Sequence, residues 1–325
     1  MSSRHRLTPA GPVDSTTPNS GPTRMPRPAT ETAPPLPGPG AAWGGAVMGL
    51  SVTASLLGVH VSTGVGTAVT AVAAVVFISL VTGTVRAPMF DDVPAWSMMT
   101  MGVLALGSAA DTNLGWAGTH AATWMIGSAA ALVVFAVQCT RLVRRKVSAV
   151  FPGVLPLVTP MVAATNAAQL GHPLPGSVFF FASLLTALPA FARVYNSAGR
   201  RPAGGLAATA WIPLGVVGQS SAAALLLTDG RTVGVVYAVA ILCLGVPAGI
   251  WAIVNHWGAL RHLPAANPSW WAATFPVGTC SLGTHTLAAA TGEGWIDVVS
   301  AVLLVLLCIH VVAATAGVAF RLVLQ

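Results

Sequence analysis

Hydroxyl, amide and proline residues recur inside five apolar segments of this chain, where a lipid environment would exclude most polar groups. Hydroxyl donors, backbone N–H groups near proline kinks and helix N-termini all present positive partial charge, so they attract a small anion without trapping it. The pattern predicts a path for anions lined by neutral groups. The candidate lining residues are Gly49, Ser51, Thr100, Ser108, Pro160, Thr165, Asn166, Pro213, Gly215, Gln219, Ser220, Pro276 and Thr279.

Any single hydroxyl in this set could instead bond to its own helix or to a neighbouring one. Their clustering on alternate apolar segments is the feature that favours a path. Cation paths are more often lined by Asp or Glu, and these segments hold neither well inside their apolar runs.

His285 lies within one of the polar-rich segments and could relay protons there. The alternative is a packing histidine bonded to a neighbouring helix. The four cysteines are far apart and show no Cys-x-x-Cys or Cys/His spacing, so neither a zinc site nor a disulfide framework is predicted. We therefore expect no metal and no cofactor.

Enzyme motifs are missing from the sequence. It contains no Gly-x-Ser-x-Gly, no His-Glu-x-x-His and no P-loop, so the chain is not expected to be an enzyme. The net charge of +7 does not indicate nucleic-acid binding, because the basic residues sit in short gaps between apolar runs.

The amino-acid composition indicates the environment of the chain and the type of element that carries these residues. Hydrophobic residues make up 54% of the chain and charged residues 7%, and the mean hydropathy is +0.76. A soluble domain carries about a quarter charged residues. We therefore expect an all-α integral membrane protein in a lipid bilayer, with ten transmembrane helices. Their predicted ranges are 41–59, 64–86, 94–112, 117–140, 150–171, 174–195, 207–228, 231–257, 268–291 and 294–320.

The ten ranges form five pairs with a very short gap inside each pair, which predicts five helical hairpins. The odd-numbered ranges hold most of the prolines and small polar residues. Lipid cannot satisfy a carbonyl that a proline frees, whereas a water-filled or protein interior can. The odd helices are therefore expected to be inner and the even helices outer, around a central pore.

Basic residues indicate the orientation in a cell membrane. All Lys and Arg except Arg231 fall on the side that holds both ends of the chain, so the N- and C-termini are predicted to be cytoplasmic. Residues 1–40 are rich in Pro, Ser, Thr and Gly and have no apolar core. They are predicted to be a disordered cytoplasmic tail, with residues 41–325 forming the transmembrane domain.

Four stretches of the chain resemble one known family, and one of them, DDVPAWSMMTMGVLALGSAA from Asp91, matches its third helix more loosely. WIPLGVVGQSSAAALLL, from Trp211, and WWAATFPVGTCSLGTHTLA, from Trp270, are similar to the seventh and ninth helices of the tellurite-resistance/dicarboxylate transporter family. FPGVLPLVTPMVAATNAAQLG, from Phe151, resembles its fifth helix. The family includes microbial malate permeases, sulfite exporters and plant guard-cell slow anion channels. The resemblance extends from about residue 41 to the C-terminus.

This resemblance implies ten helices in five hairpins, a central pore formed by the odd helices, and a homotrimer with one pore per protomer. It also implies that Phe275, in the stretch ATFPVG, occludes the pore as a gate. Without the resemblance, a buried aromatic residue would be interpreted as packing alone.

The function expected from the residues and the resemblance together is transport of small anions. The candidates are C4-dicarboxylates such as malate, and inorganic anions such as chloride, nitrate, sulfite or tellurite. A proton-coupled dicarboxylate transporter that uses His285, or a sulfite or tellurite exporter, is an alternative. A second alternative is a non-transporting sensor or scaffold in which the tail is the working part.

Overall fold

The computed structural model describes residues 36–86, 91–202, 204–259 and 267–324, and every regular element within them is a helix. The predicted tail falls almost entirely on residues 1–35, which lie outside the described residues. Each predicted range overlaps one α-helix with ends a few residues apart, so the prediction of ten helices is confirmed. The helices are α1 (Gly44–His60), α2 (Thr63–Arg86), α3 (Val93–Leu114), α4 (Ala117–Val143), α5 (Leu155–Gln169), α6 (Pro173–Tyr195), α7 (Ile212–Leu227), α8 (Thr232–Ala259), α9 (Thr274–Thr291) and α10 (Gly294–Leu324).

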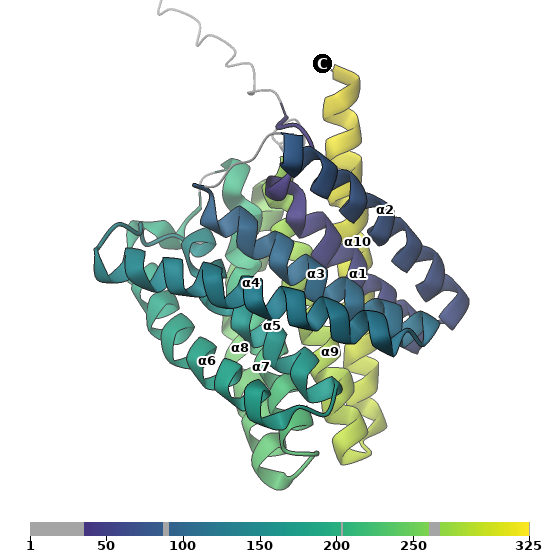
Figure 1. Ribbon diagram of the computed structural model, residues 1–325. Coiled ribbons are helices and arrows are strands. Elements are labelled where there is room, and N and C mark those ends of the chain that lie inside the picture. Colours follow the sequence, from purple (N-terminus) through teal and green to yellow (C-terminus); the bar gives the residue numbers. More distant parts are fainter. Residues whose placement is uncertain (1–35, 87–90, 203, 260–266, 325) are drawn as a thin grey trace, which may run out of the picture. The chain divides into compact units, whose positions relative to one another are not determined.

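Consecutive helices pack as five hairpins, α1–α2, α3–α4, α5–α6, α7–α8 and α9–α10. The odd helices form a closed ring in which each packs against the next and α9 packs against α1. Each even helix packs both on its hairpin partner and on the following inner helix, as α4 does where it lies across α3 and α5 (Figure 1). Because the chain reverses once within each hairpin and once more between hairpins, the five inner helices all run in the same direction.

Burial separates the two sets of helices. Over the most apolar part of each span, 61% to 83% of the residues of α1, α3, α5 and α7 are buried, against 22% to 33% in α2, α4, α6, α8 and α10. The exposed faces of the even helices consist largely of Val, Leu, Ile and Phe, which suits contact with lipid. The predicted division into inner and outer helices is therefore confirmed.

Among the described residues, nine helices are long and apolar enough to cross a membrane, and α9 is the one that falls short. It contains five Thr, together with Ser281 and His285, yet most of its residues are buried. Because α9 packs between α1, α7 and α10, it does not need an apolar surface of its own.

Four inner helices begin with 3-10 turns, at Ala41–Trp43, Phe151–Val154, Gly204–Trp211 and Pro268–Ala273, directly before α1, α5, α7 and α9. Pro213 lies in the first turn of α7, where its missing N–H breaks no helical hydrogen bond. The 3-10 segment before α7 is 8 residues long and belongs to the same membrane span. The α-helical N-terminus of α7 therefore lies inside the span rather than at its end.

Candidate functional site

The inner ring encloses a cavity of about 80 Å³, and all of its described lining residues come from the five inner helices. They are Val52, Ser55, Leu56 and Val59 of α1, Ala105, Ser108 and Thr112 of α3, Val162, Thr165, Asn166 and Gln169 of α5, Gln219 of α7, and Phe275, Leu282 and His285 of α9. The cavity therefore lies inside the ring, where a central pore is expected.

The cavity runs from the C-terminal ends of the inner helices to a buried end at Phe275. Since these helices run in the same direction, the position of a residue along its helix shows how far it lies from the open end of the cavity. The lining residues Val59, Thr112 and Gln169 lie near the C-terminal ends and are exposed. Val162 and Phe275 lie nearer the N-terminal ends and are buried, Phe275 to 5% exposure. The phenyl ring thus stands where the cavity stops.

Amide groups supply the free donors of the cavity wall. Gln219 Nε2 donates to Thr165 Oγ1 (2.7 Å), and Asn166 Nδ2 donates to a carbonyl of its own helix (2.9 Å). Gln169 accepts a hydrogen bond from Ser108 Oγ through Oε1 (3.1 Å). An NH₂ group has two hydrogens. Each of these three amides therefore keeps at least one N–H that has no partner among the described residues.

The lining hydroxyls behave differently from the amides. Ser55 Oγ donates to the carbonyl of Ser51 (3.3 Å), and Thr112 Oγ1 donates to the carbonyl of Ser108 (2.9 Å). Both bonds stay within one helix, which was the alternative considered for single hydroxyls. The donors that an anion would meet are therefore mainly amides, carried by α5 and α7.

A buried histidine on an outer helix fixes one of these amides. His120 of α4 is 2% exposed, and its Nε2–H donates to Asn166 Oδ1 (2.8 Å). Its Nδ1 lies 3.1 Å from Asp111 Oδ2. Because Asn166 Nδ2 is held by the carbonyl of Val162, the amide cannot turn over without losing both bonds. Sequence reasoning missed this contact, which joins α3, α4 and α5.

The predicted lining residues divide into three groups. Ser108, Thr165, Asn166 and Gln219 line the cavity, as do Phe275, predicted to be the gate, and His285, predicted for proton coupling. Gly49, Ser51, Thr100, Pro160, Pro213 and Gly215 lie nearer the N-terminal ends of their helices than the lining residues do, and Pro276 directly follows Phe275. None of these seven residues lines the cavity.

Two further predicted residues point elsewhere. Thr279 Oγ1 donates to the carbonyl of Pro276 (2.9 Å), and Thr279 lies where α9 packs on Gly218 of α7. Ser220 Oγ donates to the carbonyl of Val217 (3.4 Å). Neither residue lines the cavity. Gln169, which sequence reasoning did not single out, does line it, and its position four residues after Thr165 places both on one helix face.

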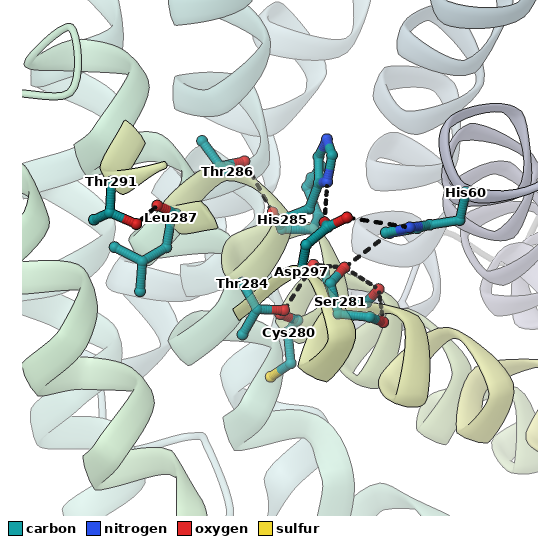
Figure 2. A network of polar contacts seen from close by, with 11 residues as sticks. His60, Cys280, Ser281, Thr284, His285, Thr286, Leu287, Thr291 and Asp297 are labelled. Carbon is teal, nitrogen blue, oxygen red and sulfur yellow. Dashed lines mark hydrogen bonds and ion pairs between the residues drawn. The ribbon is translucent and has the colours of Figure 1, made fainter. Parts of the chain in front are cut away.

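His285 lines the open part of the cavity and pairs with Asp297 of α10, with 2.8 Å between His285 Nδ1 and Asp297 Oδ1. Figure 2 shows Asp297 between His285 and His60. Among the described lining residues there is no Asp, Glu, Lys or Arg. The wall therefore offers an anion neutral donors and one imidazole, which attract it weakly.

Ten helices, a closed inner ring and a neutral polar cavity define a membrane transport protein. A family model described as "Voltage-dependent anion channel" matches residues 40–319, which is nearly the whole helical part. The chain belongs to this family, as the motifs at Phe151, Trp211 and Trp270 had indicated, and the family carries anions across membranes. No curated protein matches the chain.

Proposed function

We propose that this protein is a passive pathway for small anions along the axis of the inner ring, occluded by Phe275. The observation that carries the proposal is the cavity itself. Its described lining comes from the five inner helices alone, bears no fixed charge of Asp, Glu, Lys or Arg, and stops at a buried phenyl ring.

The lining favours anions of single charge. The cost of removing an ion from water rises with the square of its charge, and an unpaired charge in a medium of low dielectric constant is costly. Malate carries two carboxylates at neutral pH, and the described wall has no Lys or Arg to pair with either. Chloride and nitrate need only the amides of Asn166, Gln169 and Gln219. We therefore place chloride and nitrate ahead of malate.

The orientation and assembly belong to the same proposal. Among the described residues, basic side chains lie at the C-terminal ends of even helices and in the gaps after them, whereas Arg231 lies at the opposite end, before α8. This arrangement supports cytoplasmic termini. The family resemblance supports a homotrimer, for which light scattering of purified protein in detergent should give three times the chain mass of 32.9 kDa.

Ion flux from liposomes tests the function. Purified protein is reconstituted and the release of chloride, nitrate, sulfite and malate is compared with empty liposomes. Because Phe275 occludes the path, the order of the anions is measured in Phe275→Ala protein as well as in wild type. We expect nitrate and chloride to leave at least about tenfold faster than malate, a difference of about 1.4 kcal/mol in barrier height. Equal or faster malate release would contradict the charge argument.

A proton-coupled transporter is the second candidate, and the pairing of His285 with Asp297 at the cavity favours it. A coupled cycle would need His285 to change protonation while it faces Asp297 and His60. The same liposomes separate the two functions. Anion flux that follows an imposed pH gradient, and loses that dependence in His285→Ala, would favour coupling over a passive pathway.

A further inference from the structure

His60, His285 and Asp297 meet at the open end of the cavity, although they are far apart in sequence (Figure 2). His60 is the last residue of α1, His285 lies in the C-terminal half of α9, and Asp297 lies in the first turn of α10. One ring nitrogen of each histidine and one carboxylate oxygen lie within 4.8 Å of one another. Their side chains are 10%, 30% and 45% exposed, so an ion can reach them.

A pair of serines fixes the ring of His60. Ser300 Oγ donates to the carbonyl of Ser281 (2.8 Å), and Ser281 Oγ donates to the carbonyl of Ser300 (2.8 Å). Ser300 Oγ also lies 3.0 Å from His60 Nε2, and with its hydrogen directed to the Ser281 carbonyl it accepts from His60 Nε2–H. In this arrangement the neutral His60 ring has its hydrogen on Nε2 and a lone pair on Nδ1.

This lone pair faces a carboxylate. His60 Nδ1 lies 4.0 Å from Asp297 Oδ2, which is too far for a hydrogen bond. When the His60 ring is neutral in this tautomer, both the ring nitrogen and the carboxylate oxygen carry lone pairs and neither can donate to the other. A cation between them satisfies both atoms. Bonds of about 2.0–2.2 Å from a metal to nitrogen and oxygen place tetrahedral ligand atoms roughly 3.3 Å apart, so small side-chain movements complete the site.

We propose that His60, His285 and Asp297 bind one divalent transition-metal ion, with Zn²⁺ as the test ion. Two imidazoles and one carboxylate are ligands that Zn²⁺ accepts, and three protein ligands leave a fourth position open. The bond from His60 Nε2 to Ser300 is the kind of outer contact that orients a metal-binding histidine. His285 binds through Nδ1 after its hydrogen moves to Nε2 through solvent, which leaves the net charge of the ring unchanged.

The site has a consequence for transport, and this part rests on the proposed function. His285 lines the cavity, so the bound ion places positive charge and an open coordination position beside the path. An anion that enters this position is held rather than passed on, because conduction needs weak sites. Zn²⁺ is therefore expected to slow anion flux, and to stabilise the fold by joining α1, α9 and α10.

Calorimetry tests the binding without any transport assay. Protein prepared without a polyhistidine tag is titrated with Zn²⁺, and one ion per chain is expected to bind. His60→Ala, His285→Ala and Asp297→Asn should each weaken binding by at least about tenfold. Losing only a hydrogen-bond partner of a metal ligand already weakens binding by about that much, and each of these variants removes a ligand itself. His60→Gln and His285→Gln replace the alanine variants if these fail to fold.

His172→Ala is the control variant. It removes a histidine directly before α6 that stacks on Trp124, and it should bind Zn²⁺ as wild type does.

The outcomes separate this inference from the proposed function. Absence of Zn²⁺ binding in folded wild type, or unchanged affinity in the double variant His60→Gln/His285→Gln, overturns the metal site. Zn²⁺ should also slow chloride release from Phe275→Ala liposomes at least about tenfold, a barrier change of about 1.4 kcal/mol, and should have no effect once the two histidines are replaced. Binding without slowing overturns the effect on transport and leaves the site in place. If no variant releases anions, the proposed function fails while calorimetry still decides on the metal.

Discussion

Truncating Phe275 to alanine is expected to raise chloride release from liposomes by at least about tenfold, equivalent to lowering the barrier by about 1.4 kcal/mol. The ring is the largest side chain at the buried end of the cavity, and the predicted path continues on its far side along Pro276 and Gly215. Removing the ring leaves space at the point where the cavity now stops. The same amides then face a continuous path, so the order of the anions should not change.

Phe191→Ala is the matched control for this experiment. Phe191 of α6 is 5% exposed, as Phe275 is, but it lies on an outer helix and does not line the cavity. Either truncation is expected to lower stability by about 3–5 kcal/mol, so flux is compared per folded protein. A rise confined to Phe275→Ala supports the gate. An equal rise in both variants would indicate general loosening, and an unchanged Phe275→Ala rate would remove Phe275 from the path.

The transmembrane helices could be predicted from sequence because lipid imposes a strict rule. Each helix must be apolar over the thickness of the bilayer, and polar residues or prolines must face protein. The prolines and hydroxyls of α5, α7 and α9 are therefore enough to predict that these helices are inner. The same rule explains why α9 is confirmed as a helix of the inner ring although its own composition is too polar to indicate a span.

The facing of individual side chains could not be predicted in the same way. A helix buried on all sides has hydrophobic residues on every face, so periodicity does not show which face lines a cavity. Helices α1 and α7 have almost no amphipathic asymmetry, which is why Ser220 was grouped with Gln219 although only Gln219 reaches the cavity. The contacts of His120 with Asn166 and of His60 with Asp297 join distant segments, and no local pattern in one sequence reports such pairs.

Replacing Gly218 by alanine is expected to destabilise the protein by at least about 3 kcal/mol, at the upper end for overpacking. A Cβ at Gly218 would overlap backbone atoms of Thr279 and Cys280 in α9, and backbone cannot rotate aside as a side chain can. Gly283 of α9 has the complementary contact, since a Cβ there would lie 2.8 Å from the Gly218 carbonyl oxygen. Helices in lipid associate through such close packing, because lipid is as apolar as their side chains.

Gly215→Ala is the control within the same helix. A Cβ at Gly215 would lie 3.7 Å from Pro276 Cγ, an ordinary contact, and alanine favours a helix over glycine by about 1 kcal/mol. Thermal unfolding of purified protein in detergent should therefore show a lowered midpoint for Gly218→Ala and a midpoint near that of wild type for Gly215→Ala. Equal midpoints would show that α7 and α9 are not in backbone contact. Since α7 carries Gln219 and α9 carries Phe275, the same contact sets the distance between two residues that line the cavity.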